Sequence, residues 1–295
     1  MTPLGEDLQT AKNNIADFQD ITIRVLEYLP NVLSGSKEKN NYIIYVSTNS
    51  GTTKYLRPIN KKIFINSPTN FKDNFKAFQL VLAKVKTGKK TDKIEKDIID
   101  SVLYTIQQSI GVGLDLTVHP NSARKHVGNR FEELVRCVFT EIGITNKRLV
   151  LKIPYTSDKS IKYYKSENDV VLSPYPKVKS TSKDLNPNEV VVSVKTTSKD
   201  RMGKMFLDKI LLEKFVNHPQ KIIGIFLNDV QRKDTDNISY TLVSGSFLVY
   251  TQFIGKLEGV YYLDPPPTAT KAPYTNYMKQ FSELITTDIK TLLTP

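Results

Sequence analysis

One short segment, Glu189–Lys195 (EVVVSVK), constrains the fold of this 295-residue chain more than any other. Its four valines predict a β-strand, because β-branched residues in an apolar run of this length favour extended structure. Alternate side chains of a strand share a face, so Ser193 and Lys195 point to one side and Val194 points to the other. A lysine at the end of an apolar strand is costly to bury unless an anionic group meets it. The fold therefore has to bring an acid close to Lys195.

The apolar periodicity around this strand predicts an α/β core in which a mixed central sheet is flanked by helices. The expected strands are 149–153, 169–172, 190–195 and 222–227, with further strands within 240–262, and the expected helices are 128–142, 201–217 and 277–293. A stretch rich in Pro, Ser and Lys at 173–188 predicts an exposed loop between two of the strands.

The first part of the chain predicts a mainly helical region with a short β element. Helical periodicity covers 5–29, where Pro30 would stop the helix, and returns in 71–85 and 94–110. Two strands are expected at 41–48 and 61–66, separated by a loop that contains Gly51 and Pro58. An extended piece at 114–118 follows Gly111 and Gly113. We place a boundary near 111–121, which separates an N-terminal region for DNA contact or dimerisation (1–115) from the core (116–295).

The charge of the chain favours a polyanionic partner. Lys and Arg number 42 against 30 Asp and Glu, which gives a net charge of +12 and raises the local concentration of nucleic acid. No apolar run reaches the roughly 18 residues of a membrane span, and the N-terminus lacks the apolar core of a secretory signal. The single cysteine, Cys137, excludes an internal disulfide framework and a multi-cysteine metal site. We expect a protein of the cytoplasm with no membrane partner.

A second strand offers the acid that Lys195 needs. Asp169 opens the apolar run Asp169–Leu172, and pairing of this strand with 190–195 would let Asp169 and Lys195 meet at one end of the hairpin. A carboxylate for a divalent metal and an ammonium group that orients water are what phosphodiester hydrolysis requires. The alternative is an ordinary acid at the start of a strand and a surface lysine at the end of a sheet.

Two helices supply further acids. Asp208 shares a stripe of the helix 201–217 with Leu211 and Leu212, where a carboxylate is costly unless it is paired or bound to a metal; the alternative is an ion pair with Lys204. In the helix 128–142, Glu132 lies at the edge of the apolar stripe and can reach a cleft, whereas Glu133 is expected to face solvent.

These residues together resemble the active site of the PD-(D/E)xK type II restriction endonucleases, in the branch of EcoRII and NgoMIV. That branch has an acid, then Ser-x-Lys, then an acid on the next helix, which Asp169, Ser193, Lys195 and Asp208 match in order. The run 195–201 (KTTSKDR) resembles the Lys-Thr-Thr-x-(Lys/Arg)-(Asp/Glu)-Arg run of the EcoRII-like enzymes. The run 124–132 (RKHVGNRFE) resembles their Arg-Lys-x-Arg-x-Gly-x-x-(Leu/Phe)-Glu helix entry. The resemblance covers 122–227, about a third of the chain.

The resemblance implies a restriction-endonuclease-like fold and a role for each matched residue. Asp169, Asp208 and Glu132 would bind Mg²⁺, Lys195 would activate water, and Ser193 marks the position that the usual acid has left. The chain departs from the pattern in two places: Asp208 stands where the family has the longer Glu, and Asn168 stands where it has Pro.

The resemblance also implies how DNA would be bound. Lys199, Asp200 and Arg201 match the run that reads CC/GG, because Arg and Lys can donate to guanine and a carboxylate can accept from cytosine N4. Arg124, Lys125, His126 and Arg130 are candidates for DNA contacts, mainly to phosphates. A charged helix start that touches no DNA is the alternative for both groups.

The sequence therefore predicts a prokaryotic, Mg²⁺-dependent type II restriction endonuclease that cuts double-stranded DNA at a CCGG- or CCNGG-like palindrome. A palindrome calls for a homodimer, which could pair into a tetramer, and a cognate DNA methyltransferase would be its functional companion. Two alternatives remain at this point. One is a structure-specific repair or recombination nuclease of the same fold, and the other is a basic DNA-binding protein without catalytic activity.

Overall fold

The computed structural model describes residues 2–49, 51–199 and 201–294, so that Asp200 of the predicted recognition run lies outside the described residues. A six-stranded mixed sheet forms its centre, with the order β11-β10-β7-β6-β5-β4. The pairs β4–β5 and β5–β6 are antiparallel, and the remaining neighbours are parallel. The strands are β4 (Thr145–Ser157), β5 (Ser160–Ser173), β6 (Val190–Lys195), β7 (Lys221–Asn228), β10 (Gly259–Asp264) and β11 (Met278–Gln280).

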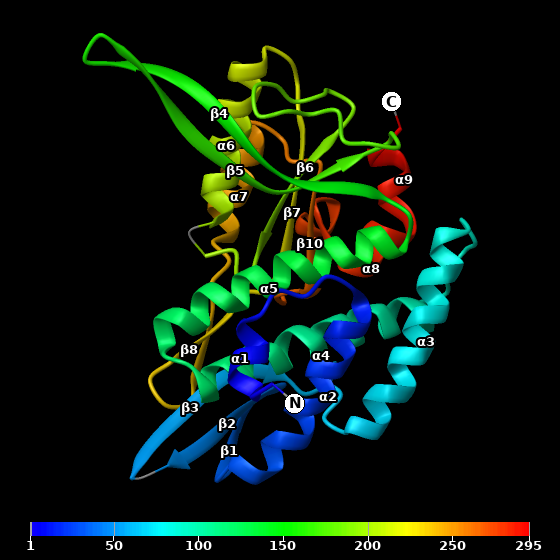
Figure 1. Ribbon diagram of the computed structural model, residues 1–295, viewed down its shortest axis with the longest axis vertical. Helices are drawn as coiled ribbons and strands as arrows, with labels where there is room; N and C mark the ends of the chain where they lie inside the picture. Colours follow the sequence, from blue (N-terminus) through cyan, green and yellow to red (C-terminus); the bar gives the residue numbers. More distant parts are fainter. Residues whose placement is uncertain (1, 50, 200, 295) are drawn as a thin grey trace.

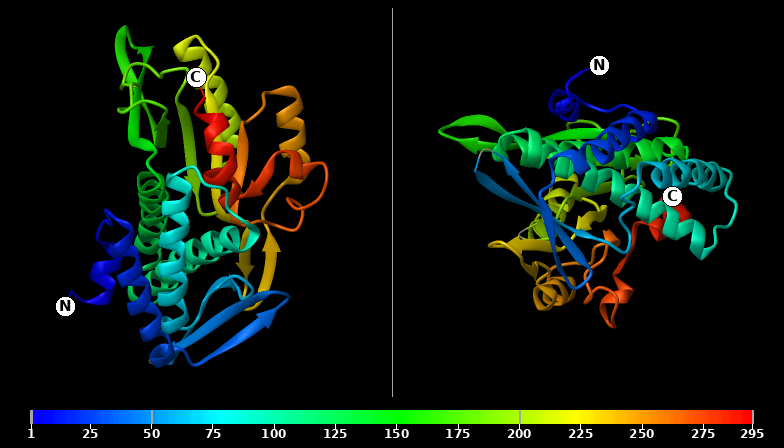
Figure 2. Two further views of the ribbon diagram at one scale, coloured as in Figure 1. Left: turned by 90° about the vertical axis from the view of Figure 1, so that its right-hand side faces the viewer. Right: turned by 90° about the horizontal axis from the view of Figure 1, so that it is seen from below.

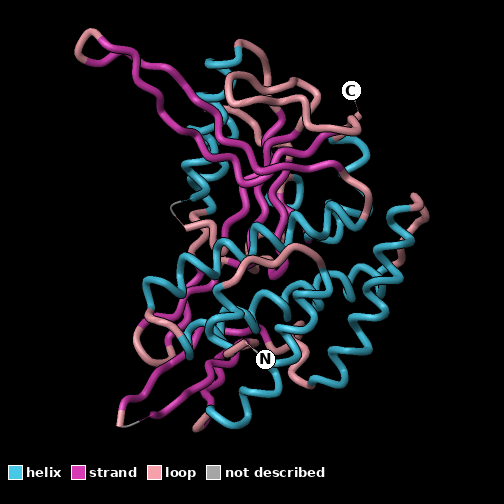
Figure 3. Tube along the Cα trace, in the orientation of Figure 1, coloured by secondary structure: helices cyan, strands magenta, loops and turns pink. Residues whose placement is uncertain are grey.

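Helices cover both faces of this sheet, as Figures 1 and 3 show. On one face, alternate valines of β5 and β6 pack with α4 (Lys93–Thr117), α5 (Pro120–Glu141) and the C-terminal segment. On the other face, Val171 and Val191 pack with α6 (Arg201–Val216) and α7 (Ser244–Phe253). The predicted α/β class with a mixed sheet flanked by helices is confirmed. Within the described residues, none of the helices combines the length and the apolar character that crossing a membrane requires.

The N-terminal part is mainly helical, as predicted, and carries a three-stranded antiparallel sheet where two strands were expected. Its apolar side chains join those of the central sheet in one core, and its elements pack along α4 and α5 (Figure 2). The elements are α1 (Leu4–Gln9), α2 (Ile15–Val32), β1 (Gly35–Lys39), β2 (Tyr42–Asn49), β3 (Thr52–Asn60) and α3 (Pro68–Lys86).

The helix α4 continues seven residues beyond its predicted end at Ile110, so the extended piece expected at 114–118 is wrong. Gly111 and Gly113 do not end it, because both are needed for close packing rather than for a turn. A Cβ atom on Gly111 would lie 2.2 Å from the guanidinium of Arg57, and one on Gly113 would lie 2.8 Å from Leu8. Tertiary contacts thus explain two glycines whose pattern resembles a helix stop.

The proline positions mislead in a similar way. Pro30 lies in the last turn of α2 and removes one i→i−4 hydrogen bond there, and the helix runs on only to Val32. Pro58 lies within β3, opposite Ile44, and β3 is an edge strand of its sheet, where proline is tolerated. The strand predicted at 61–66 is therefore wrong: β3 ends at Asn60 and a turn follows.

The C-terminal region departs most from the prediction. The range 240–262 holds the helix α7 in addition to strands, and β8 (Val230–Lys233) and β9 (Asn237–Tyr240) form a separate hairpin. The predicted terminal helix begins instead with β11, which completes the central sheet beside β10. A helical segment, which includes a π-helical turn at Leu284–Asp288, then follows. Hairpin and helix are hard to distinguish here because the apolar runs are short.

Candidate active site

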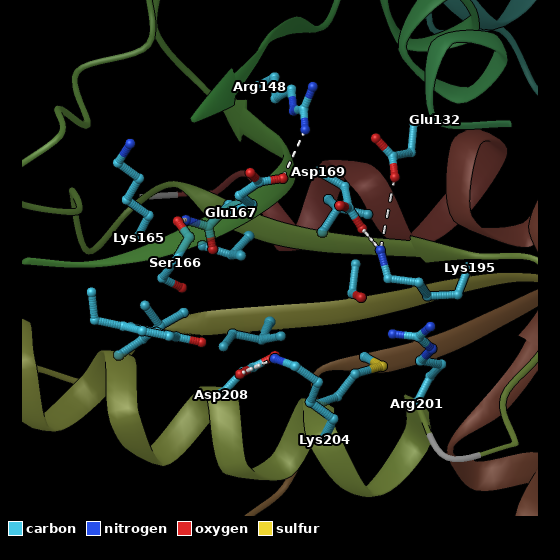
Figure 4. Close-up of a pocket in the computed structure, with 18 of the residues that line it drawn as sticks. Glu132, Arg148, Lys165, Ser166, Glu167, Asp169, Lys195, Arg201, Lys204 and Asp208 are labelled. Atoms are coloured by element: carbon cyan, nitrogen blue, oxygen red, sulfur yellow. Dashed lines mark hydrogen bonds and ion pairs between the residues drawn. The ribbon is translucent and has the colours of Figure 1, made fainter. Parts of the chain in front are cut away.

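A cleft of about 400 Å³ opens where α5, the β4–β5 hairpin, β6 and α6 meet (Figure 4). It is lined mainly by charged and polar side chains: Asn129, Glu132, Arg148, Lys165, Ser166, Glu167, Asn168, Asp169, Ser193, Lys195, Arg201, Lys204 and Asp208. The candidate catalytic and metal-binding residues predicted from the sequence all lie in its wall. They come from four separate elements, which only the fold brings together.

The contact between Asp169 and Lys195 lies where β5 and β6 separate. The pairing of these strands ends at Val170 and Val192, so the side chain of Asp169 is free to turn into the gap. Its Oδ2 accepts hydrogen bonds from the Lys195 ammonium group and from the backbone N–H of Val194, the latter at 2.8 Å. The strand pairing that was expected to bring the two residues together is present. Asp169 is buried, and Lys195 remains partly exposed.

A β-bulge in β5 contributes to this geometry. The register between β4 and β5 shifts between Lys147 and Leu149, and three steps of β5, from Asn168 to Val171, oppose two steps of β4. A bulge re-aims the side chains on either side of it and is common next to active sites. Here it separates the buried valines of β5 from a hairpin that projects beyond the sheet.

Glu132 reaches the same point from α5. Its carboxylate lies 3.8 Å from the Lys195 ammonium, and burial raises its pKa to about 7, with a further rise from the nearby charge of Asp169. Lys195 and Arg148 act in the opposite direction and lower the pKa. Burial and the charge of Asp169 thus disfavour ionisation of Glu132, and both carboxylates are held around one ammonium group. We call Glu132, Asp169 and Lys195 the cleft cluster.

The cleft cluster fits a divalent cation. Mg²⁺ takes oxygen ligands and is often bound by only one or two carboxylates, with water and substrate phosphates completing its shell. Asp169 and Glu132 supply two such groups. A cation bound between these carboxylates would relieve the repulsion between their negative charges. Among the described residues, however, there is no group of three or more Asp, Glu, His or Cys side chains placed to hold a metal ion.

Asp208 is the acid that the structure leaves out of this set. It lines the cleft from α6, but both of its carboxylate oxygens accept from the ammonium of Lys204 at 2.6 Å (Figure 4). Lys204 precedes it by four residues, so the two side chains are neighbours on one helix face. The expected three-acid ligand set of Glu132, Asp169 and Asp208 is therefore not formed, and the alternative ion pair with Lys204 is found.

Two residues of the predicted recognition run, Lys199 and Arg201, can be placed at the junction of β6 and α6. Arg201 is exposed at the start of α6 and lines the cleft, and Lys199 is exposed just before it. Ser193 lies partly exposed in the cleft wall, where it offers no carboxylate. Arg201 is thus accessible in the same cleft as the cleft cluster.

A buried acid that the sequence did not single out, Asp229, fixes the backbone of Ser198, the residue before Lys199. Its carboxylate accepts from the backbone N–H of Ser198 at 2.6 Å, from the hydroxyl of Tyr262 at 2.7 Å and from that of Thr241 at 3.0 Å. Burial raises its pKa, and these hydrogen bonds oppose the rise. Asp229 directly follows the apolar strand β7, and this position is the only feature of the sequence that could have pointed to it.

Three of the predicted DNA contacts lie at the start of α5, and they differ in exposure. Arg124 and Lys125 are exposed, and Arg124 borders a second groove that also contains Arg57 and Arg232. Partial burial and the neighbouring cations lower the pKa of His126, which is only partly exposed. Helix α5 begins eight residues before the predicted start at Gly128, so these residues lie on the helix itself.

Arg130 is a correction to the predicted DNA contacts. It is 3% exposed and donates to the carbonyl of Gln9 at 2.9 Å and to Glu133 at 2.6 Å. Glu133 also accepts from the backbone N–H of Lys12 at 2.8 Å, so its expected solvent position is wrong as well. Both side chains connect α5 to the segment between α1 and α2. We call Lys12, Arg130 and Glu133 the α5 anchor.

No protein-family model matches the chain, and no curated protein matches its sequence significantly. Among solved structures, that of the Type IIP restriction endonuclease Kpn2I superposes with a TM-score of 0.73, at 18% identity, over 98% of this chain and 97% of that one. The chain has a restriction-endonuclease fold. The complex of the restriction endonuclease PspGI with its substrate DNA overlaps more weakly, with a TM-score of 0.43 and 12% identity over 75% of this chain and 92% of that one.

Proposed function

We propose that this protein is a type II restriction endonuclease that hydrolyses double-stranded DNA at a short palindrome containing G·C pairs, of the CCGG or CCNGG kind, with Mg²⁺ as its cofactor. The observation that carries the proposal is the cleft cluster, in which Lys195 contacts Asp169 and approaches Glu132 at the open end of the strand pair β5–β6. The restriction-endonuclease fold and the net charge of +12 support it.

Asp169 and Glu132 are the residues that would hold Mg²⁺. When bound, the ion would neutralise charge on the scissile phosphate and lower the pKa of a water molecule. In this proposal Asp208 keeps its ion pair with Lys204 in the opposite wall of the cleft and does not bind the metal. The Ser193 position needs no acid, because Glu132 provides the second carboxylate from α5.

The chain's own groups orient the reaction. The hydrogen bond from the Val194 N–H fixes Asp169, and Asp169 in turn directs the ammonium of Lys195 into the cleft. That ammonium would orient the attacking water and a phosphate oxygen. Because Glu132 belongs with Asp169 to the metal-binding pair, Lys195 is the group that would orient or deprotonate the water.

Recognition would use the exposed cations around the cleft. Lys199 and Arg201, together with Asp200, would read neighbouring G·C pairs in the major groove. Arg124 and Lys125 would contact phosphates and fix the register of the protein on the duplex. A palindromic site requires a two-fold homodimer, in which each subunit cuts one strand, and two dimers could form a tetramer. A cognate methyltransferase would protect the host's own sites.

A plasmid digest tests the proposal. The purified protein with Mg²⁺ should yield discrete bands, and run-off sequencing of the ends should place every cut at one short palindrome. Lys195→Ala should lower cleavage by about 10³-fold while duplex binding is largely kept. A smear, or cuts confined to branched substrates, would indicate the repair nuclease. Binding with a steep salt dependence but no cleavage would indicate the DNA-binding protein without activity.

A further inference from the structure

The hairpin formed by β4 and β5 extends well beyond the central sheet, as Figures 1 and 3 show. We call its outer part, residues 152–165, the β4–β5 arm. Its strands stay in regular register up to the pair Ser157 and Ser160 at the tip. Large apolar and aromatic side chains are exposed along it, with Ile161 at 70% and Tyr163 at 59%. Apart from Ile153 at its base, which is buried in the core, the arm contributes little to the core and is available for contact with a partner.

The arm is strongly positive. Residues 152–165 contain four lysines and one aspartate. Asp158 pairs with Lys162 at 3.5 Å, whereas no carboxylate of the described residues forms an ion pair with Lys152 or Lys165. These two lysines are direct register partners on neighbouring strands, so their side chains share one face of the hairpin. Like charges directly opposite each other destabilise a strand pair, and a polyanion on that face would relieve the cost.

The arm begins at the cleft. Tyr164 and Lys165 belong to both the arm and the cleft wall, and Ser166 and Glu167 continue that wall toward Asp169. The nine steps of β5 from Asp169 to the tip at Ser160 span about 30 Å at the rise of a β-strand. That length corresponds to about nine base pairs along a duplex. A duplex placed in the cleft would thus be within reach of the arm beyond the base pairs next to the cut.

We propose that the β4–β5 arm binds the phosphate backbone of the DNA that flanks the cleavage site. The inference rests on the proposed function, because it takes the nucleic acid in the cleft as given. Lys152 and Lys165 would neutralise phosphates, and the exposed tyrosine hydroxyls would donate to phosphate oxygens. A second copy of the chain is the less favoured partner, because a two-fold contact between identical arms would place like charges against one another.

Salt-dependent binding tests the arm directly. The probe is a random-sequence duplex of about 40 base pairs, without Mg²⁺, because phosphate contacts carry no sequence information. The double variant Lys152→Ala/Lys165→Ala should raise the Kd about tenfold at moderate salt and lower the slope of log K against log[salt] by about 2. Lys152→Arg/Lys165→Arg, which keeps both charges, should bind as the unaltered protein does.

The matched control is Lys72→Ala/Lys76→Ala on α3. It removes the same charge from exposed lysines on an element that lies on the other side of the molecule (Figure 1). If the arm variant and this control have the same Kd and salt slope, the arm proposal is overturned, even though the unaltered protein cuts plasmid at one site. A change in oligomeric mass with an unaltered salt slope would also overturn it, in favour of a contact between copies. If the unaltered protein binds no duplex, the proposed function itself fails.

Discussion

Glu132 and Glu133 are neighbours on α5, yet they serve two different regions. Glu132 belongs to the cleft cluster, where it faces another carboxylate and burial raises its pKa to about 7. Glu133 belongs to the α5 anchor, where it accepts hydrogen bonds from the Arg130 guanidinium and from the backbone of Lys12. The environment of Glu132 lowers the stability of the fold, whereas the hydrogen bonds of Glu133 raise it.

The comparison teaches how to separate a reactive acid from a structural one. Both side chains are 19% exposed, so burial alone does not distinguish them. The difference lies in the partners: Glu133 has donors for its oxygens, whereas Glu132 shares one ammonium with a second carboxylate. Like charges held together at a cleft usually indicate that an additional cation or a proton is used there.

The largest effect should come from Glu132→Gln. The change keeps the shape of the side chain but removes a carboxylate of the cleft cluster, so we expect plasmid cleavage to fall by at least about 100-fold. The melting temperature should stay the same or rise, because a repulsion between buried charges is lost. Glu133→Gln is the matched control one position away, and it should keep most of the activity. Equal cleavage by the two variants would remove the distinction between the regions.

The α5 anchor should show the reverse pattern. Arg130→Ala leaves the carboxylate of Glu133 without its cation and frees the carbonyl of Gln9, and breaking such a buried pair costs about 3 kcal/mol. Urea unfolding measures the loss, and cleavage by the folded fraction should be close to normal. If Arg130→Ala instead kept its stability and lost DNA affinity, the guanidinium would have to reach the duplex after all.

A third buried acid, Asp100, lies outside the cleft and should make the stability of the protein depend on pH. Burial raises the pKa of Asp100 to about 8, while hydrogen bonds from the backbone N–H and the hydroxyl of Ser282 oppose the rise. Because this pKa lies above that of the unfolded chain, the folded protein holds the proton more tightly, and stability falls as the pH rises from about 4 to about 8. Relative to Asp100→Asn, the protein should lose about 3 to 4 kcal/mol between pH 5 and pH 8. Parallel stability curves for the two proteins would show that Asp100 does not titrate in this range.

The smallest effect is expected for Asp208→Ala. The carboxylate is engaged by Lys204 across one helical turn, and a partly exposed pair of this kind is worth less than about 1 kcal/mol. We expect cleavage to change by less than about tenfold, with little change in melting temperature. A loss as large as that of Glu132→Gln would return Asp208 to the metal-binding set and would show that Lys204 releases it in the complex with DNA.

Much of the fold could be predicted from the sequence because its central strands are strongly patterned. The strand β6 and the start of α6 lie where the apolar runs place them, and β2 differs from the prediction by one residue. In the N-terminal part, the errors cluster at Pro30, Pro58, Gly111 and Gly113, each of which would end a helix or strand if only its local sequence counted. In the structure, an edge strand, a last helical turn and two close contacts accommodate them.

The site could be predicted only as far as strand geometry reaches. Asp169 and Lys195 come together because two adjacent strands end at the same place, and the alternation of side chains follows from the sequence. The position of Glu132 at the edge of its helix also follows from helical periodicity. Asp229 and the α5 anchor were missed, because each is defined by partners more than 20 residues away in the chain.

The sequence by itself determined the strands, the helices and the chemical character of the residues at their ends, since these depend on local periodicity and on the cost of burying charge. Only the tertiary structure decided which charges meet. Asp208 pairs with Lys204, Glu132 lies beside Asp169 and Lys195, and Arg130 is buried against Glu133. The energy of an ion pair depends on distance and burial, and the spacing of residues along the chain determines neither of them.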